Sequence, residues 1–406
     1  MATDTTKAGI PGPTATASER ALIDSAQGWM VVGATFLATF VVFGVAYSFG
    51  SFFESMADEF DTGKGATALM FSITTALYFF LGLITGRVTD RVGPRPVMAF
   101  GAVSLGVGLL ATSRVNSIWA GYLTYGIGVG MAVACCYVPM VSTVGAWFVR
   151  RRTAAMGVSV AGIGFGTLVM APAAASLIDR WGWRDTYVFL GVAGAALLLV
   201  GSLAARRPPR SATEESPDLG AVIRDRRFLV LYGASLLLTV TLFVPFVFIE
   251  QYATSHDIPS SRGAALVGII GGASIAGRLA LGALGARLGA VRLMQLSFGT
   301  TAASFLIWLL SGGAYPLLVV FAVVMGVGYG GFIALAPAVT AIMFGTRGLG
   351  TILGALYTGA GIGGLIGPPL AGAVIDATSY EAAILAAAVV GGVATAILGL
   401  LPRVDG

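Results

Sequence analysis

The sequence predicts an all-α integral membrane protein with twelve transmembrane helices arranged in two six-helix bundles. Hydrophobic residues make up 56% of the 406 residues, charged residues make up 11%, and the mean hydropathy is +0.88. Soluble domains carry roughly 25% charged residues, so this composition excludes a soluble globular fold. The apolar residues are gathered in long stretches, and the two halves of the chain repeat one pattern.

Each predicted helix is an apolar stretch long enough to cross about 30 Å of hydrocarbon at about 1.5 Å per residue. In chain order the stretches are 28–53, 66–86, 96–113, 117–145, 153–178, 186–205, 228–249, 262–286, 293–311, 316–343, 349–375 and 380–401. The polar residues 1–27 contain no apolar core of a signal peptide, so we expect a disordered cytoplasmic tail. Cys135 and Cys136 are adjacent in the fourth stretch, where a disulfide would be strained, and we interpret them as packing residues.

The positions of Lys and Arg predict the orientation, because short cytoplasmic loops are enriched in these residues. If both termini are cytoplasmic, the cations on the outer side are only Lys64, Arg114, Arg180, Arg184 and Arg262. The cations are dispersed over many loops, which explains the pI of about 9.4 without a nucleic-acid-binding face.

An internal repeat with an offset of about 197 residues divides the predicted helices into six and six. The matched positions are Gly157, Gly162, Gly164, Gly166, Pro172 and Asp179 with Gly354, Gly359, Gly361, Gly363, Pro369 and Asp376. Close helix packing is the main interpretation of the glycines, with cavity lining or helix bending as the alternatives. We expect an N-terminal bundle at 28–205, a cytoplasmic central loop at 206–227, a C-terminal bundle at 228–401 and a cytoplasmic tail at 402–406. Parallel repeats of this kind are typical of transporters with a site between two rocking halves.

Arg278 is the one basic residue that no loop can accommodate, because it lies inside the apolar segment 264–284. It precedes Arg287, at the expected membrane boundary, by nine residues, which places it about 13 Å inside at 1.5 Å per residue. A guanidinium at that depth costs about 3 kcal/mol on insertion scales, so it normally faces a cavity and an anion. Its planar set of donors suits a carboxylate. A structural arginine bonded to backbone carbonyls is the alternative.

The segment 86–95 reads GRVTDRVGPR and lies between the second and third predicted helices. It resembles the loop motif of the major facilitator superfamily, which implies the twelve-helix fold of that superfamily. In the superfamily the acid and arginines of this motif form a cytoplasmic ionic latch, a role that the resemblance implies for Asp90 and Arg91, and we add Arg150 and Arg151 from the basic cluster before the fifth helix. Ala286 replaces the acid in the second copy of the motif.

Two further segments resemble the monocarboxylate transporter family and its oxalate–formate exchanger relatives. Residues 147–157 read WFVRRRTAAMG, similar to the family's signature at the fifth helix, and residues 24–29 read DSAQGW, similar to its first-helix motif apart from two glycines. The resemblance covers nearly all of the chain and implies that Arg278 binds the substrate carboxylate. Because the likeness is to short-tailed prokaryotic members, we expect a multi-pass protein of the bacterial inner membrane with both termini in the cytoplasm.

Tyrosines at membrane depth are candidate substrate-binding residues, because a buried phenol needs a hydrogen-bond partner that a substrate can supply. The candidates are Tyr329, Tyr125, Tyr47 and Tyr357, with ordinary packing as the alternative for each. Ser274 lies one turn from Arg278 and is expected to share its cavity. The segment 351–374 contains no second cation, which favours a monocarboxylate over a dicarboxylate.

The residues that the family uses for proton coupling are replaced in this chain. Animal members of the family place an acid one turn before the arginine and a lysine in the first helix, whereas this chain has Ser274 and no lysine in 29–53. Glu250 and His256 lie near the outer mouth and are the candidate proton sites, although a lone histidine on a polar loop is more often only solvated.

These observations predict a secondary active transporter of small monocarboxylates such as lactate or pyruvate, working by alternating access, with proton symport favoured over exchange. The alternatives are an anion exchanger of the oxalate–formate type and a carboxylate sensor without flux. An enzyme is not expected, because the predicted spans contain no histidine and no paired carboxylates. We expect no cofactor and no metal, and a monomer whose partners are a small carboxylate, a proton and the lipid bilayer, without nucleic acid.

Overall fold

The computed structural model describes residues 25–208, 219–345 and 349–401, and this part of the chain is helical apart from its turns and connections. Eleven helical stretches in it are long and apolar enough to cross a membrane. One of them, Ala154–Ala204, has 51 residues, about twice the number that 30 Å of hydrocarbon requires. It is interrupted at Gly182, whose φ of 78° separates two helices. The twelve predicted spans are therefore present.

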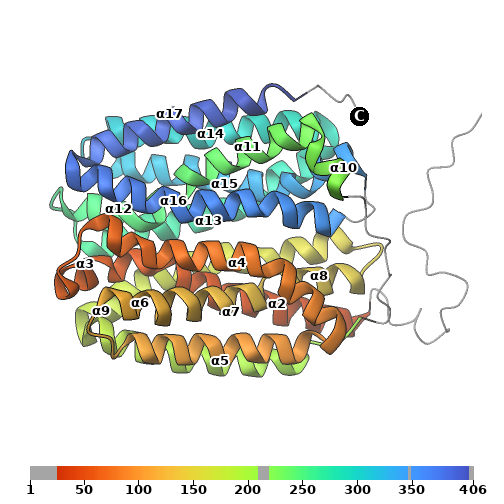
Figure 1. Ribbon diagram of the computed structural model, residues 1–406, viewed down its shortest axis with the longest axis horizontal. Helices are drawn as coiled ribbons and strands as arrows, with labels where there is room; N and C mark the ends of the chain where they lie inside the picture. The colour runs from red at the N-terminus through yellow and green to blue at the C-terminus, as the bar shows by residue number, and fades with distance from the viewer. Residues whose placement is uncertain (1–24, 209–218, 346–348, 402–406) are drawn as a thin grey trace, which may run out of the picture.

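The two halves of the chain form two packed groups of roughly parallel helices, one below the other in Figure 1. The N-terminal half contains α2 (Ala26–Tyr47), α3 (Phe49–Phe60), α4 (Lys64–Val92), α5 (Pro94–Thr112), α6 (Ile118–Gly121), the π-helix η1 (Tyr122–Ile127), α7 (Gly128–Cys136), α8 (Val138–Trp147) and α9 (Arg152–Ala204). The C-terminal half contains α10 (Leu219–Arg224), α11 (Arg226–Leu242), α12 (Val244–Thr254), α13 (Ser260–Leu288), α14 (Ala290–Leu310), α15 (Tyr315–Phe344), α16 (Leu349–Ala377) and α17 (Tyr380–Leu398).

Three predicted spans are built from more than one helix. The first span consists of α2 and α3, the seventh of α11 and α12, and the fourth runs from α6 to α8. Proline lies in the first turn of both α8 and α12, at Pro139 and Pro245. A proline has no N–H to continue the hydrogen-bond ladder, so the preceding helix ends there.

The repeated glycines let helices approach closely, as the packing interpretation predicts. A Cβ on Gly166 of α9 would collide with the carbonyl oxygen of Phe40 in α2, and one on Gly363 of α16 would collide with Thr239 in α11. These contacts lie within one bundle each. Gly164 and Gly361, two residues earlier in each copy, face the opposite bundle instead, against α13 and α4 respectively.

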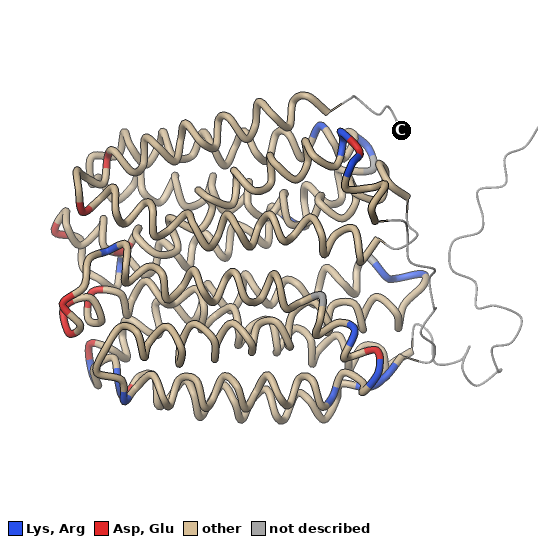
Figure 2. The backbone as a smooth tube through the Cα atoms, in the orientation of Figure 1, with Lys and Arg blue, Asp and Glu red and all other residues tan. Residues whose placement is uncertain are grey.

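Charged residues lie mainly at the two ends of the molecule, with most Lys and Arg at one end and most Asp and Glu at the other (Figure 2). We call these the basic end and the acidic end. The basic end holds the C-terminal turns of α4 and α13, with Arg91 and Arg287. The acidic end holds the C-terminal turns of α3 and α16, with Glu59 and Asp376. The helices between the two ends are almost free of charge, as transmembrane segments require.

The close approach of α9 to α2 predicts that Gly166→Ala destabilises the protein. The added Cβ would meet the backbone oxygen of Phe40, which cannot move aside as the tip of a side chain can. Overpacking of this kind costs about 1–3 kcal/mol, so the midpoint of thermal unfolding in detergent should fall. Gly392→Ala in α17 is the control, because no atom lies within 4 Å of its Cβ position. Equal midpoints for the two variants would contradict the packing argument.

Candidate functional site

Arg278 lies on α13 at the seam between the bundles and is only 9% exposed. Its Nη1 donates a hydrogen bond of 2.7 Å to the carbonyl oxygen of Val160 in α9, which belongs to the opposite bundle. The centre of the guanidinium lies 5.5 Å from the centroid of the Tyr329 ring. Nε and Nη2 are buried and have no partner among the described residues.

Nε and Nη2 share one edge of the planar guanidinium, and this edge is the one that binds a carboxylate through two parallel bonds. Leaving a buried donor unpaired costs about 1–3 kcal/mol, and more when the donor is charged. One hydrogen bond to a backbone carbonyl holds Arg278, which is part of what a purely structural arginine would show. That bond uses Nη1 and leaves the carboxylate-binding edge, Nε and Nη2, without a partner among the described residues.

A small cavity lined mainly by aromatic side chains lies between the bundles, and Tyr329 both lines it and faces the guanidinium of Arg278. Its free space is about 20 Å³, which is room for about one water molecule. The lining residues are Phe43, Tyr47, Tyr78, Phe79, Tyr137, Ile163, Thr239, Leu242, Phe243, Tyr329, Phe332, Ile333, Tyr357 and Ala360. The hydroxyls of Tyr47 and Tyr329 lie 3.3 Å apart and join the two bundles. A larger occupant therefore requires these side chains to move.

The tyrosines predicted from depth divide into two groups. Those that line the cavity are Tyr47, Tyr329 and Tyr357. Tyr125 does not line it, because its ring packs against Phe49 and Tyr187 within the N-terminal bundle. Its buried hydroxyl has no hydrogen-bond partner among the described residues, and no described contact joins Tyr125 to Arg278.

Ser274, which helical spacing places one turn from Arg278, forms no side-chain hydrogen bond with it among the described residues. Its hydroxyl donates to the carbonyl oxygen of Gly271 at 2.7 Å, and the residue is fully buried. Gly330 of α15 packs directly against its backbone. The hydroxyl of Ser274 is thus satisfied within its own helix.

Two tyrosines that line the cavity were not predicted from the sequence, Tyr78 of α4 and Tyr137 between α7 and α8. Their rings pack edge-on against Phe43, with centroid distances of 5.7 Å and 5.1 Å. The available signal for Tyr137 was Pro139, because a proline two residues later predicts a break in the helix. No comparable signal separates Tyr78 from an ordinary packing residue.

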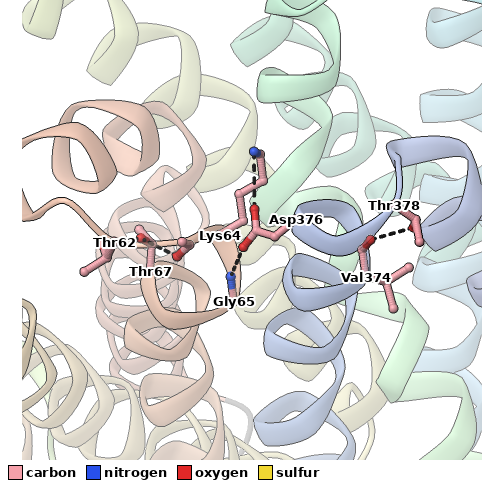
Figure 3. Close-up of polar contacts among 8 residues, drawn as sticks. Thr62, Lys64, Gly65, Thr67, Val374, Asp376 and Thr378 are labelled. Atoms are coloured by element: carbon pink, nitrogen blue, oxygen red, sulfur yellow. Dashed lines mark hydrogen bonds and ion pairs between the residues drawn. The ribbon is translucent and has the colours of Figure 1, made fainter.

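Asp376 joins the bundles at the acidic end (Figure 3). Its carboxylate lies 3.5 Å from Nζ of Lys64 and accepts a 3.4 Å hydrogen bond from the backbone N–H of Gly65. Both groups belong to the first turn of α4, where the helix dipole favours an anion. We call these contacts of Asp376 with Lys64 and Gly65 the α4–α16 clasp.

Glu250 of α12 joins the bundles at a second place near the acidic end. Its carboxyl group accepts hydrogen bonds from Ser51 of α3, in the opposite bundle, and from Ser260 of α13, each 2.7 Å long. The residue is 4% exposed, and none of the ion pairs in the described residues includes it. Glu250 and Arg278 are the only buried Asp, Glu, Lys, Arg or His residues in the described part of the chain.

His256, the second predicted proton site, is separate from Glu250. Its Nδ1 lies 2.8 Å from the carbonyl oxygen of Tyr252 and 3.2 Å from the hydroxyl of Ser255, and its ring packs on that of Tyr252. The side chain is partly exposed at the acidic end. These local contacts account for His256 without a role at the seam.

The bundles are joined less toward the basic end. Among the described residues, the hydrogen bonds between them lie in the middle, as from Arg278 to Val160, or near the acidic end, as from Ser51 to Glu250. No hydrogen bond between described residues joins the bundles at the basic end.

The latch residues predicted from the loop motif lie at this looser end. Asp90 and Arg91 are exposed, and Asp90 forms no ion pair within the described residues. The carbonyl oxygen of Arg91 accepts a hydrogen bond from Arg207. Arg150 and Arg151 are exposed at the start of α9. Asp90 therefore makes no ionic latch with the described residues in this conformation.

Comparison with known proteins places the chain among transporters. The family model described as Major Facilitator Superfamily matches residues 35–314 and 272–405. The chain is 31% identical over 377 residues to monocarboxylate transporter 3 of Rattus norvegicus, across 88% of this chain and 76% of the relative. It is 31% identical to monocarboxylate transporter 4 of Mus musculus (87% and 78% covered) and 27% identical to monocarboxylate transporter 12 of Homo sapiens (89% and 78% covered).

Solved structures share the fold at low sequence identity. A bacterial homologue of the human lysosomal transporter Spinster, in an inward-facing and occupied conformation, matches with a TM-score of 0.75 and 15% identity, over 91% of this chain and 96% of that chain. The nucleoside transporter NupG matches with a TM-score of 0.74 and 16% identity, over 93% and 100%. These matches confirm the predicted fold, and the named relatives are transporters rather than enzymes.

The α4–α16 clasp predicts that Asp376→Asn loosens the acidic end. A partly exposed ion pair of this kind contributes about 0.2–1 kcal/mol. Its loss should increase the fraction of molecules with an open seam, and so the accessibility of a buried seam residue, by up to about fivefold. Thr75 of α4 is buried against Gly364 of α16 and supplies the reporter position. The thiol of Thr75→Cys should react correspondingly faster with a thiol reagent when Asp376→Asn is added.

Asp58→Asn is the matched control for this experiment. Asp58 lines the same surface cleft as Asp376, but its carboxylate forms no hydrogen bond within the described residues. Adding Asp58→Asn should leave the labelling rate of the Thr75→Cys reporter unchanged. An unchanged rate with Asp376→Asn as well would show that the clasp does not hold the seam.

Proposed function

The chain belongs to the monocarboxylate transporter family of the major facilitator superfamily, and on this premise we propose that it transports small monocarboxylates by alternating access. The observation that carries this proposal is the free edge of Arg278, whose Nε and Nη2 are buried between the bundles without a partner among the described residues. An ionised carboxylate supplies two acceptors that match this edge. The substrate would therefore bind at the seam and contact both bundles.

Charge counting supports one carboxylate rather than two. Arg278 is the only buried Lys or Arg in the described residues, and the segment 351–374 of α16 contains neither residue type. A dicarboxylate would keep one negative charge unpaired in a low-dielectric site, which is strongly unfavourable.

Arg278 connects substrate binding to movement of the bundles. Its Nη1 already bonds to Val160 in the opposite bundle, and the substrate would occupy the other edge. An anion there neutralises the buried guanidinium while the bond to Val160 is kept, so the substrate would favour a closed seam over an open one. With the basic end in the cytoplasm, as the positive-inside rule predicts, the present conformation would face inward.

We assign the transported proton to Glu250. A buried carboxyl group without a cationic partner favours its neutral form, and protonation changes the bond that Glu250 accepts from Ser51 across the seam. Moving one proton with one monoanion also makes the cycle electroneutral. The opposing candidate, exchange without a proton, is favoured by two missing residues of the family's proton relay: Ser274 stands where the acid would be, and the segment 29–53 contains no lysine.

The substrate site predicts a large loss of transport in Arg278→Ala. Truncating one partner of a buried charge pair costs about 2–5 kcal/mol, so uptake of labelled lactate or pyruvate into proteoliposomes should fall by at least about 30-fold. Arg278→Lys should recover little, because an ammonium lacks the two-donor edge. Arg292→Ala, which removes an exposed arginine of α14, is the control. Undiminished uptake by Arg278→Ala would overturn the site, and binding without any uptake by the wild type would favour a sensor.

The proton site predicts separate effects on two transport modes in Glu250→Gln. Uptake driven by a pH gradient should be lost, because the amide cannot release a proton. Counterflow of labelled against unlabelled substrate should remain, because exchange of loaded carriers needs no change of protonation. Asp58→Asn should keep both modes. Persistent pH-driven uptake in Glu250→Gln would place the proton elsewhere, and pH-independent counterflow alone in the wild type would identify an exchanger.

A further inference from the structure

The fourth membrane span is interrupted beside the cavity. Tyr137, between α7 and α8, has φ −103° and ψ −83°, outside the helical range. Pro139 in the next turn has no N–H to continue the helix. Thr85 of α4 donates a 2.7 Å hydrogen bond to the carbonyl oxygen of Ala134, near the end of α7. Side-chain bonds of this kind make a broken helix tolerable in a membrane protein, and such breaks accompany ligand sites in transporters.

The interruption changes which residue faces α4. Gly130, two turns before Tyr137, faces α4 so closely that a Cβ would lie 2.9 Å from Leu77. An uninterrupted helix would place residue 137 on that same crowded face. In the structure Val138 takes this position. Its Cγ2 lies 3.1 Å from the point that a Cβ on Gly82 of α4 would occupy. The Tyr137 ring lies in the cavity instead and packs against Phe43 of α2.

The tyrosines of the cavity differ in the contacts of their hydroxyls and rings. The hydroxyls of Tyr47 and Tyr329 bond to each other, whereas those of Tyr137 and Tyr357 form no hydrogen bond within the described residues. The Tyr137 ring packs against Phe43, which also contacts the ring of Tyr47, the hydrogen-bond partner of Tyr329. The Tyr357 ring packs instead against Phe79 of α4. Tyr137 therefore offers a hydroxyl without a hydrogen bond among the described residues, in the same cavity as Tyr329, whose ring faces the guanidinium of Arg278.

We propose that Tyr137 is a specificity-determining residue, whose hydroxyl donates to an oxygen on carbon 2 of the substrate. The inference rests on the proposed function, in which the Nε–Nη2 edge of Arg278 binds both carboxylate oxygens. The substituent on the adjacent carbon then meets the next donor, which is the Tyr137 hydroxyl. A phenol donates to a 2-oxo or a 2-hydroxy oxygen alike. An acid without this oxygen leaves the phenol unpaired, and sites built to bond a substrate oxygen reject analogues that lack it.

The test compares lactate and pyruvate with propionate, which has the same three-carbon skeleton but no oxygen on carbon 2. Each acid competes with uptake of labelled pyruvate into proteoliposomes containing the full-length protein. We expect the wild type to bind lactate more tightly than propionate. Tyr137→Phe should weaken lactate binding about two- to tenfold, the range for one neutral hydrogen bond, and leave propionate unchanged. Tyr357→Phe, which removes another unpaired cavity hydroxyl, should leave the ratio of the two acids unchanged.

The ratio of the two acids separates specificity from a merely structural effect. An equal loss for lactate and propionate in Tyr137→Phe would mean that the residue serves folding or the carboxylate, and would overturn the inference. An unchanged ratio, or a wild type that does not distinguish the two acids, would overturn it as well while leaving monocarboxylate transport intact. A wild type that transports none of these acids would overturn the proposed function together with the inference.

Discussion

The absence of water from the hydrocarbon region is the constraint on which the rest of this structure depends. Every polar group there must find its partner inside the protein, so the chain is helical and its hydroxyl side chains bond to carbonyl oxygens. Thr39 bonds in this way to Ser159 of another helix. Arg278 departs from the rule with two unpartnered buried nitrogens, more than any other described residue has. The same constraint that makes the fold regular therefore marks the place where a ligand is needed.

Small residues perform two different tasks on one helix. Lipid tails are as apolar as the side chains, so helices associate through close packing rather than through the hydrophobic effect. Gly363 of α16 packs against α11 of its own bundle, where the neighbours include the backbone of Leu236, and this contact is rigid. Gly361 faces the opposite bundle, where its neighbours include the ring of Phe80, which can rotate. One short repeat thereby supports rigid bundles and a seam between them that can move.

Features set by composition and depth could be predicted from the sequence, whereas features set by the rotation of a helix could not. Hydropathy located the spans, and the distance to the membrane boundary located Arg278. Tyr125 and Ser274 lie at suitable depths but face their own bundles, because each residue turns the helix by about 100° and depth does not record this angle. The break at Tyr137 changes the angle for one residue, so a regular helical pattern misplaces it.

Glu250 and Arg278, the two buried charged residues in the described part of the chain, suggest why a proton and an anion would move together. Glu250 and Arg278 both lie on the C-terminal bundle and both bond across the seam, to Ser51 and Val160. With neither ligand bound, an ionised Glu250 and Arg278 sum to zero charge, and with both a proton and a monoanion bound the sum is again zero. A proton alone would leave a net buried positive charge, and an anion alone a net negative one, which a closed low-dielectric seam strongly disfavours. Rocking would then be permitted only for the empty and the fully loaded protein, which is the condition for tight symport.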